Sequence, residues 1–333
     1  GEDFEIENKM GKYICDELDS IAKHTSSVNT LICSKGFTKG YNTDYFGLEF
    51  SLKYNNISKI YGILNGTCNY ILTKMEKEGK DFSLVLKDAQ KLGFAELDPT
   101  FDIKGFDTAH KLALLAAIAD GAKPAFSQLS IEGVDQITSE DITLAGELGY
   151  KIKVLAVYKK LANASQQAVY PALIKQSEKI AQVDDSFNAI LTKASNADWS
   201  FAVGRGAGGF PTASAVVADL IDFANDRYSY VFGIKTDNLK EANINKVSNR
   251  VGGYFLKLVL NKDLAKESDL AQSIFGNTIK IQHSVFIDQE DAILCGFITE
   301  NCKEQDVTDI LKSLDSNLVT SSKFLRVEDI NGF

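Results

Sequence analysis

The chain has 333 residues, more than one hydrophobic core usually organises, so we expect two or three domains. Its 36 basic and 45 acidic residues give a formal net charge of -9, and this acidic balance argues against nucleic acid as a partner. The five cysteines and three histidines are widely spaced without a CxxC pair, so the sequence predicts neither a disulfide framework nor a metal site. No apolar run spans a membrane and the N-terminal GEDFEIENKM is not signal-like, so we expect no membrane partner and a cytoplasmic location.

The segment 54–125 is predicted to be rich in helix. It opens with the strand-like ISKIYGIL. Three later stretches place apolar residues at spacings of three and four, as amphipathic helices do: NYILTKMEKEG, FSLVLKDAQKLG and FDTAHKLALLAAIADG. Gly93 and Gly121 are expected to end the last two of these helices.

The segment 126–203 changes to the alternating pattern of strands. This pattern occurs in QLSIEGV, YKIKVLAVYKK and QQAVYPALI, and WSFAVG is a further strand candidate. We expect an antiparallel-type sheet with helices packed on it, and therefore an α+β fold rather than repeated βαβ units.

The segment 253–328 forms a separate pattern of predicted elements. The order is strand, helix, strand, strand, helix, strand, read from GYFLKLVLN, LAKESDLAQSIFG, TIKIQHSVFI, DAILCGFITE, DVTDILKSLD and SKFLRVE. This is the split βαβ arrangement, βαββαβ, in about the length of one small domain.

Four carboxylates gather near one lysine in the stretch 92–111, LGFAELDPTFDIKGFDTAHK. Asp107 and Lys111 are four residues apart on a predicted helix, so the aspartate can orient the lysine. Asp102 and Glu96 lie upstream in a loop that could return to the helix start, and a lysine held in this way can act as general acid and base. Asp98 completes the group. The alternative is a solvated surface with ordinary salt bridges and helix caps.

The stretch GRGAGG, 204–209, matches GxGxxG formally, with a strand-like segment before it and an apolar helical run after it. Free backbone amides at the helix start could face an anion. The alternative is a tight strand-to-helix turn that needs positive φ.

Four motifs in order resemble the catalytic domain of homoserine dehydrogenase over residues 54–250. They are GILNGTCNYILTKM, LGFAELDPTFDIKGFDTAHK, IEGVDQIT and GRGAGGFPTASAVVADL. The C-terminal residues 251–333 resemble the ACT domain that many members carry, although NKDLAKESDL lacks the Pro-Gly often found after its first strand. The resemblance implies a catalytic domain of mixed sheet and helices, followed by an ACT-like regulatory domain.

The resemblance also implies roles for individual residues. The lysine matching Lys111 transfers a proton at the substrate hydroxyl, with Asp102 and Asp107 beside it as catalytic residues. The carboxylates of Glu96, Asp102 and Asp107 hold the amino group of homoserine and the lysine, and Thr67 lies in the substrate pocket.

The cofactor implied by the resemblance is NAD or NADP, approached by the glycines Gly93, Gly206 and Gly208. The reaction would interconvert L-homoserine and L-aspartate 4-semialdehyde in threonine and methionine biosynthesis. A homo-oligomer and an amino-acid effector at the ACT-like domain are further expectations.

Residues 1–53 do not fit this family. They contain no GxG, so the nucleotide-binding Rossmann domain is expected to be truncated or absent. Instead, DELDSIAKHTSSVNTLICSKGFTKGYNTDYFGLEFSLK resembles a fragment of shikimate dehydrogenase, in which Asn29 and Asp44 would bind the hydroxyls of the substrate.

Three functional hypotheses therefore stand. The first is an NAD(P)-dependent oxidoreductase like homoserine dehydrogenase. The second is an inactive amino-acid-binding or oligomerisation module, which would not bind NADPH saturably. The third is an activity related to shikimate dehydrogenase.

Overall fold

A computed structural model describes the protein over residues 17–18, 30–34, 37–41 and 56–330, apart from 93–94, 227–231, 233, 264–273 and 277. The chain divides into two compact units, 1–56 with 194–200, and 57–193 with 201–333. In the first unit, strands β1 (Glu17–Leu18), β3 (Phe37–Tyr41) and β2 (Thr30–Ser34) form a small sheet in that order. Asn29 and Asp44 lie outside the described residues, so the resemblance to shikimate dehydrogenase stays a prediction.

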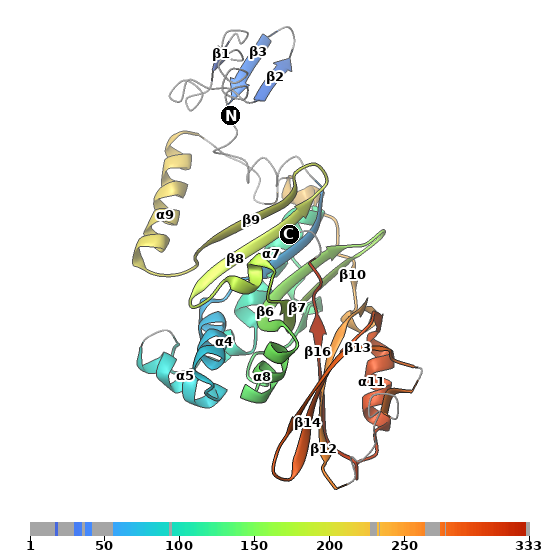
Figure 1. Ribbon diagram of the computed structural model, residues 1–333. Coiled ribbons are helices and arrows are strands. Elements are labelled where there is room, and N and C mark those ends of the chain that lie inside the picture. The colour runs from blue at the N-terminus through green and yellow to red at the C-terminus, as the bar shows by residue number, and fades with distance from the viewer. Residues whose placement is uncertain are drawn as a thin grey trace, which may run out of the picture. The chain divides into compact units, whose positions relative to one another are not determined.

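A large mixed sheet organises the second unit (Figure 1). Its order is β13-β14-β12-β16-β7-β6-β4-β8-β9, and two further strands also pair with β7. The long strands between residues 57 and 205 are β4 (Ile57–Ile63), β6 (Tyr150–Lys160), β7 (Ser165–Lys175), β8 (Phe187–Ala194) and β9 (Asp198–Arg205). The predicted strands in this part are present and β6 and β7 are antiparallel, which confirms the α+β class.

The two central strands are buried on both faces rather than alternating. Every residue of β7 except Lys175 is buried, and most of β6 is buried as well. Helix α7 (Phe106–Asp120) and the 3-10 turn at Val247–Asn249 both contact β7. The polar residues of β7 are therefore buried together with its apolar ones.

Helices pack against this sheet and place the candidate site. The helices are α4 (Gly66–Glu78), α5 (Phe82–Lys91), α6 (Thr100–Ile103), α7 (Phe106–Asp120), α8 (Ser139–Glu147) and α9 (Gly209–Ala224). Helix α7 contacts β4, β6 and β7 and ends, as predicted, at Gly121 with a φ of 59°. Among the described residues, no helix combines the length and apolar character needed to cross a membrane.

The C-terminal strands extend the same sheet. Strands β12 (Tyr254–Asn261), β13 (Ile281–Asp288), β14 (Ala292–Thr299) and β16 (Val319–Val327) are joined by antiparallel pairings, with α11 (Glu304–Ser313) between the last two. The strand order β13-β14-β12-β16 agrees with the split βαβ pattern. The first predicted helix of this pattern falls largely outside the described residues, and the ACT-like assignment stays a prediction. Short elements complete the chain: β5 (Ser130–Ile131), β10 (Ile244–Asn245), β11 (Val251–Gly252), β15 (Cys302–Lys303), and 3-10 turns at Phe126–Gln128, Lys179–Gln182, Thr236–Asn238 and Val247–Asn249.

Buried charges join the C-terminal strands to the central sheet. The Glu328 carboxylate, directly after β16, accepts hydrogen bonds from Lys159 Nζ at 2.7 Å, Tyr170 Oη at 2.9 Å and Arg250 Nη2 at 3.1 Å. Burial by itself raises the pKa of Glu328, but the two cations and the hydrogen bonds outweigh it and lower that pKa to about 2. The carboxylate is therefore ionised, and each buried cation has its counter-charge.

Candidate active site

The ion pair predicted from the sequence forms on α7. Lys111 Nζ lies 2.7 Å from Asp107 Oδ2 and also donates to the backbone carbonyl of Leu64 at 2.9 Å. The lysine is partly exposed, so the pair contributes little to stability, and its main consequence is to orient the ammonium group. An ammonium has three N–H donors, and two are used within the described residues, which leaves one for a ligand oxygen.

Asn65 joins the two aspartates at the end of β4. Its Nδ2 donates to Asp102 Oδ1 at 2.8 Å and to Asp107 Oδ2 at 2.9 Å. Its Oδ1 accepts from the backbone N–H of Cys68 at 2.9 Å, so the same side chain is the N-cap of α4. The buried Asn65 amide thus fixes the positions of the Asp102 and Asp107 carboxylates relative to the first turn of α4.

A glycine turn brings Asp102 to this position. Gly105 has a φ of 83° and separates α6, which carries Asp102, from α7, which carries Asp107. A side chain there would be strained and would crowd Ile131 and Val169. The expected loop at Asp102 is in fact the short helix α6, because Pro99 and Asp98 start a helical turn before Gly105 reverses the chain.

The other predicted residues of this stretch lie in different surroundings. Asp98 lies directly before Pro99, the N-cap of α6, and accepts hydrogen bonds from the hydroxyl of Thr100 at 2.6 Å and from its backbone N–H at 3.1 Å, which lower the pKa of Asp98. Glu96 is exposed, and within the described residues its carboxylate contacts neither Lys111 nor Asp107. Thr67 is half-buried in the first turn of α4, two residues after Asn65. The structure therefore brings together Asp102, Asp107 and Lys111 but not Glu96.

The site carries more negative than positive charge. Two carboxylates, Asp102 and Asp107, share one lysine and one neutral amide. The net charge of this group is negative, so it favours a further cation such as the ammonium of a ligand. The arrangement can therefore hold an amino group while Lys111 donates to an oxygen.

An apolar groove of about 530 Å³ opens beside Lys111. Its walls come from the end of β4, from α7, and from β8 and β9, and most of the lining side chains are aliphatic. Asn188 on β8 lies in this groove and donates through Nδ2 to the carbonyl of Leu64 at 3.3 Å, the same carbonyl that Lys111 contacts. A flat ring with little charge suits such a groove.

The glycine turn between β9 and α9 lies at the edge of this groove. Gly208 has a φ of 120°, as the tight-turn alternative requires. A Cβ at Gly206 would overlap the amide of Asn188, so a glycine is needed there for close packing against the groove. Gly93, the third predicted cofactor residue, lies outside the described residues.

Sequence reasoning missed Asn65 and Asn188. Asn65 lies in the motif GILNGTCNYILTKM, whereas Asn188 lies on β8, a strand that the sequence patterns did not predict. Nothing in the spacing of either residue links it to Lys111. Asn65 is 37 and 42 residues from its two carboxylate partners, and Asn188 is 124 residues from Leu64. The one local signal was an asparagine directly before a helical pattern, which marks an N-cap.

Comparison with known proteins assigns the chain to a family. A model of the homoserine dehydrogenase family matches residues 47–221, more than half of the chain. Homoserine dehydrogenase of Helicobacter pylori (strain ATCC 700392 / 26695) is 34% identical over 288 residues, which are 85% of this chain and 68% of that protein. Homoserine dehydrogenase of Neisseria gonorrhoeae (strain ATCC 700825 / FA 1090) is 46% identical over 177 residues, which are 53% of this chain and 41% of that protein.

Solved structures agree with these relatives. A homoserine dehydrogenase from Thiobacillus denitrificans superposes with a TM-score of 0.75 at 35% identity and covers 85% of this chain and 67% of that one. The chain thus spans between 41% and 68% of the length of these three relatives. The matched residues include the carboxylates, Asn65 and Lys111. The chain belongs to the homoserine dehydrogenase family, a family of oxidoreductases.

Proposed function

We propose that the chain interconverts L-homoserine and L-aspartate 4-semialdehyde with NAD or NADP, as part of threonine and methionine biosynthesis. The observation that carries the proposal is the oriented Lys111 beside a pair of carboxylates. Among the described residues, the lysine keeps one N–H for a ligand and no second cation pairs with either carboxylate. A substrate with an ammonium at one end and a hydroxyl or aldehyde at the other matches both features.

In the oxidative direction, the substrate hydroxyl gives its proton to the amine of Lys111 while a hydride leaves the carbon that bears this hydroxyl. In the reverse direction, the ammonium of Lys111 returns the proton to the aldehyde oxygen. Hydrogen bonds to Asp107 and to the Leu64 carbonyl hold Lys111 Nζ in place. The proton transfer then needs no further search for the correct geometry, which lowers its entropic cost. Asp102, with Glu96 and Thr67, is proposed to hold the amino end of the substrate.

NAD(P), when bound, accepts or supplies the hydride. The groove beside Lys111 suits the flat nicotinamide ring because its lining is largely aliphatic. Gly206 and Gly208, in the turn after β9, are proposed to approach the cofactor through their backbone. Gly93 is proposed as a third contact.

The assay is NADPH oxidation with L-aspartate 4-semialdehyde by the full 333-residue chain. Lys111→Ala should lower kcat by a factor of about 10² or more, because a positioned acid–base group contributes at least that much. The matched control is Lys104→Met. Lys104 also forms an ion pair with an aspartate, Asp135 at 2.8 Å, and is exposed to a similar extent, but it lies outside the site.

Equal rates in wild type and Lys111→Ala would refute the role of the lysine. No rate in wild type, together with no saturable NADPH binding, would instead favour the inactive amino-acid-binding or oligomerisation module. A homo-oligomer and a cytoplasmic location are proposed from the family resemblance and are tested by the mass of the purified chain in solution and by cell fractionation.

A further inference from the structure

The carbonyl oxygen of Leu64 accepts hydrogen bonds from two side chains. Lys111 Nζ donates to it at 2.9 Å, and Asn188 Nδ2 donates to it at 3.3 Å. Leu64 lies between the last residue of β4 and Asn65, the N-cap of α4, so its carbonyl is outside both elements. The two side-chain donors therefore help to fix the direction of this carbonyl.

Two glycines make room for the amide group of Asn188. A Cβ built at Gly206, in the turn between β9 and α9, would overlap Asn188 Nδ2. Gly66, the first residue of α4, lies close to the other end of the amide. A Cβ built there would be 3.6 Å from Asn188 Oδ1 and 2.8 Å from the carbonyl oxygen of Ser186. The backbone at both glycines thus confines the amide to one position.

The segment before Asn188 is attached to the same helix. Asn69 on α4 donates through Nδ2 to the carbonyl of Val183 at 2.9 Å and to that of Phe187 at 3.2 Å. Asn69 is only 2% exposed, so water hardly competes for these hydrogen bonds. Helix α4 therefore places Asn188, and through its N-cap Asn65 it also places the carboxylates of the candidate active site.

The surroundings of Asn188 would favour an apolar side chain. Most side chains that line the groove beside Lys111 are aliphatic. Among the described residues, Asn188 Oδ1 is buried and has no hydrogen-bond partner, which opposes folding. Leucine has nearly the same shape as asparagine and would fill this space without an unpaired polar atom. What the amide adds is the hydrogen bond to the Leu64 carbonyl, so its role lies in that bond.

We propose that Asn188 is a positioning residue for the proton transfer by Lys111. Its amide holds the Leu64 carbonyl, and this carbonyl and Asp107 together fix two N–H directions of Lys111 Nζ. Because an ammonium is tetrahedral, fixing two of its N–H groups also fixes the third, which is the one that faces a ligand oxygen. The inference rests on the proposed function, since the proton transfer is part of that function.

The first test is the kinetics of Asn188→Leu, which keeps the size of the side chain and removes the donor. This variant should lower kcat about tenfold or more, and it should leave the KM for L-aspartate 4-semialdehyde within about twofold, because the carboxylates near Lys111 are untouched. Its free energy of unfolding in urea should not fall below that of wild type. Asn188→Ala should show the same loss of kcat.

The same exchange is then made in the Lys111→Ala background. A residue that acts only through Lys111 has no further effect once the lysine is gone, so Asn188→Leu should not lower the residual rate of Lys111→Ala. A purely structural role of Asn188 would lower the rate in both backgrounds.

The second test needs neither substrate nor cofactor. It is competitive labelling of the lysines by acetic anhydride, read by mass spectrometry of the peptides. Hydrogen bonds to the ammonium protect Lys111 from labelling, so Asn188→Leu should raise its labelling about threefold or more. Lys104 is the internal reference, because it is exposed to a similar extent and is also paired with an aspartate.

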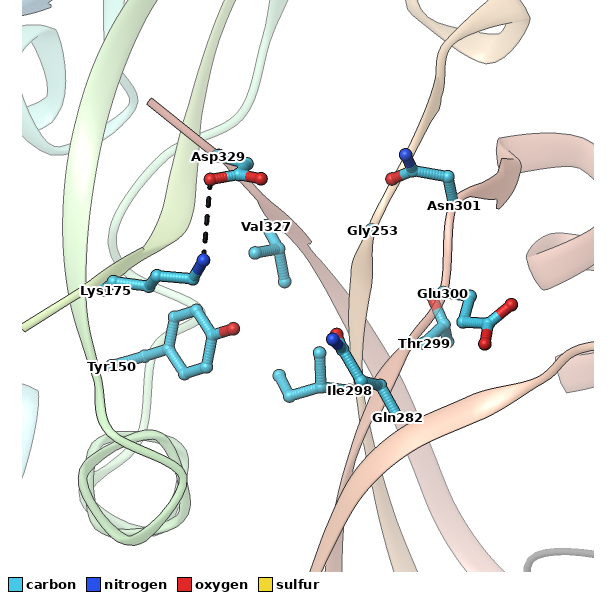
Figure 2. A pocket seen from close by; sticks show the side chains of 10 residues that line it. All are labelled: Tyr150, Lys175, Gly253, Gln282, Ile298, Thr299, Glu300, Asn301, Val327 and Asp329. Atoms are coloured by element: carbon cyan, nitrogen blue, oxygen red, sulfur yellow. Dashed lines mark ion pairs between the residues drawn. The ribbon is translucent and has the colours of Figure 1, made fainter. Parts of the chain in front are cut away.

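The control variant comes from a separate cavity of about 490 Å³, which Figure 2 shows. Lys175, at the end of β7, lines this cavity and lies 3.6 Å from Asp329 (Figure 2). It is about as exposed as Lys111, and the cavity shares no lining residue with the groove beside Lys111. Lys175→Met should therefore change neither kcat nor the labelling of Lys111.

Three results would overturn the inference. They are a wild-type kcat in Asn188→Leu, a loss of rate that persists in the Lys111→Ala background, and unchanged labelling of Lys111 in Asn188→Leu. A wild-type chain without turnover would count against the proposed function instead, and the labelling would then decide by itself whether Asn188 orients Lys111.

Discussion

The exchange of Asn65 for aspartate tests how the candidate site is assembled. Asn65→Asp keeps an oxygen that can cap α4 through the backbone N–H of Cys68. It replaces the amide that donates to Asp102 and Asp107 at 2.8 and 2.9 Å with a carboxylate. Three carboxylates then meet where two had shared one donor group.

The expected cost depends on pH. Two like charges about 3 Å apart repel by about 5 kcal/mol at an effective dielectric constant of about 20, so the introduced carboxyl binds a proton and its pKa rises in the folded state. The cost is therefore limited to that of protonating an aspartate with an ordinary pKa of about 3.9, which is about 4 kcal/mol at pH 7 and about 1.5 kcal/mol at pH 5. Because the pKa of this carboxyl is higher in the folded than in the unfolded state, the substitution destabilises the folded protein at high pH. This loss of stability disappears as the pH falls toward the pKa of the aspartate in the unfolded chain.

The assay is urea-induced unfolding of wild type, Asn65→Asp and Asn65→Ala at pH 5, 6 and 7. Asn65→Ala loses the cap and both hydrogen bonds without adding a charge, so its deficit should be nearly independent of pH. Asn65→Asp should lose less stability at pH 5 than at pH 7. A deficit for Asn65→Asp that is constant with pH, or below about 1 kcal/mol at pH 7, would refute the reasoning that Asn65 holds two ionised carboxylates.

Two further predictions concern the buried network and the glycine turn. Because the pKa of Glu328 falls from 4.5 to about 2, its ionisation contributes about 3 kcal/mol at pH 7 that is lost as the pH falls from about 4.5 to 2. Glu328→Gln should therefore have a free energy of unfolding several kcal/mol below that of wild type at neutral pH, and this difference should narrow as the pH falls from about 4.5 to 2. The surface control Glu241→Gln should show no such difference, and a Glu328→Gln deficit that stays constant from pH 7 to 3 would contradict the prediction. Gly206→Ala should lower kcat/KM about tenfold or more, because the new methyl group displaces the Asn188 amide from the Leu64 carbonyl. Gly209→Ala is the control, because its Cβ would meet no atom within 4 Å, and it should leave kcat/KM unchanged. Equal kinetics in the two variants would argue against close packing at the turn.

Local patterns in the sequence determined the elements and the first pair of the site. The strands of the middle segment and the helices of the first segment follow from periodicity, because side-chain direction repeats every 2 residues in a strand and every 3.6 in a helix. Asp107 and Lys111 could be paired for the same reason, since they are one helical turn apart. The family followed from four motifs in order, and the comparisons confirm it.

Only the tertiary structure decided which distant groups complete that pair. Asn65 reaches Asp102 and Asp107 because β4 ends beside α7, and Glu328 meets Lys159 across 169 residues because β16 pairs with β7. Glu96 is close in sequence to Asp102, but it is exposed and precedes α6, whereas α6 carries Asp102 to the start of α7. Contacts of this kind depend on how sheets and helices pack, and no periodicity in the chain records which elements will become neighbours.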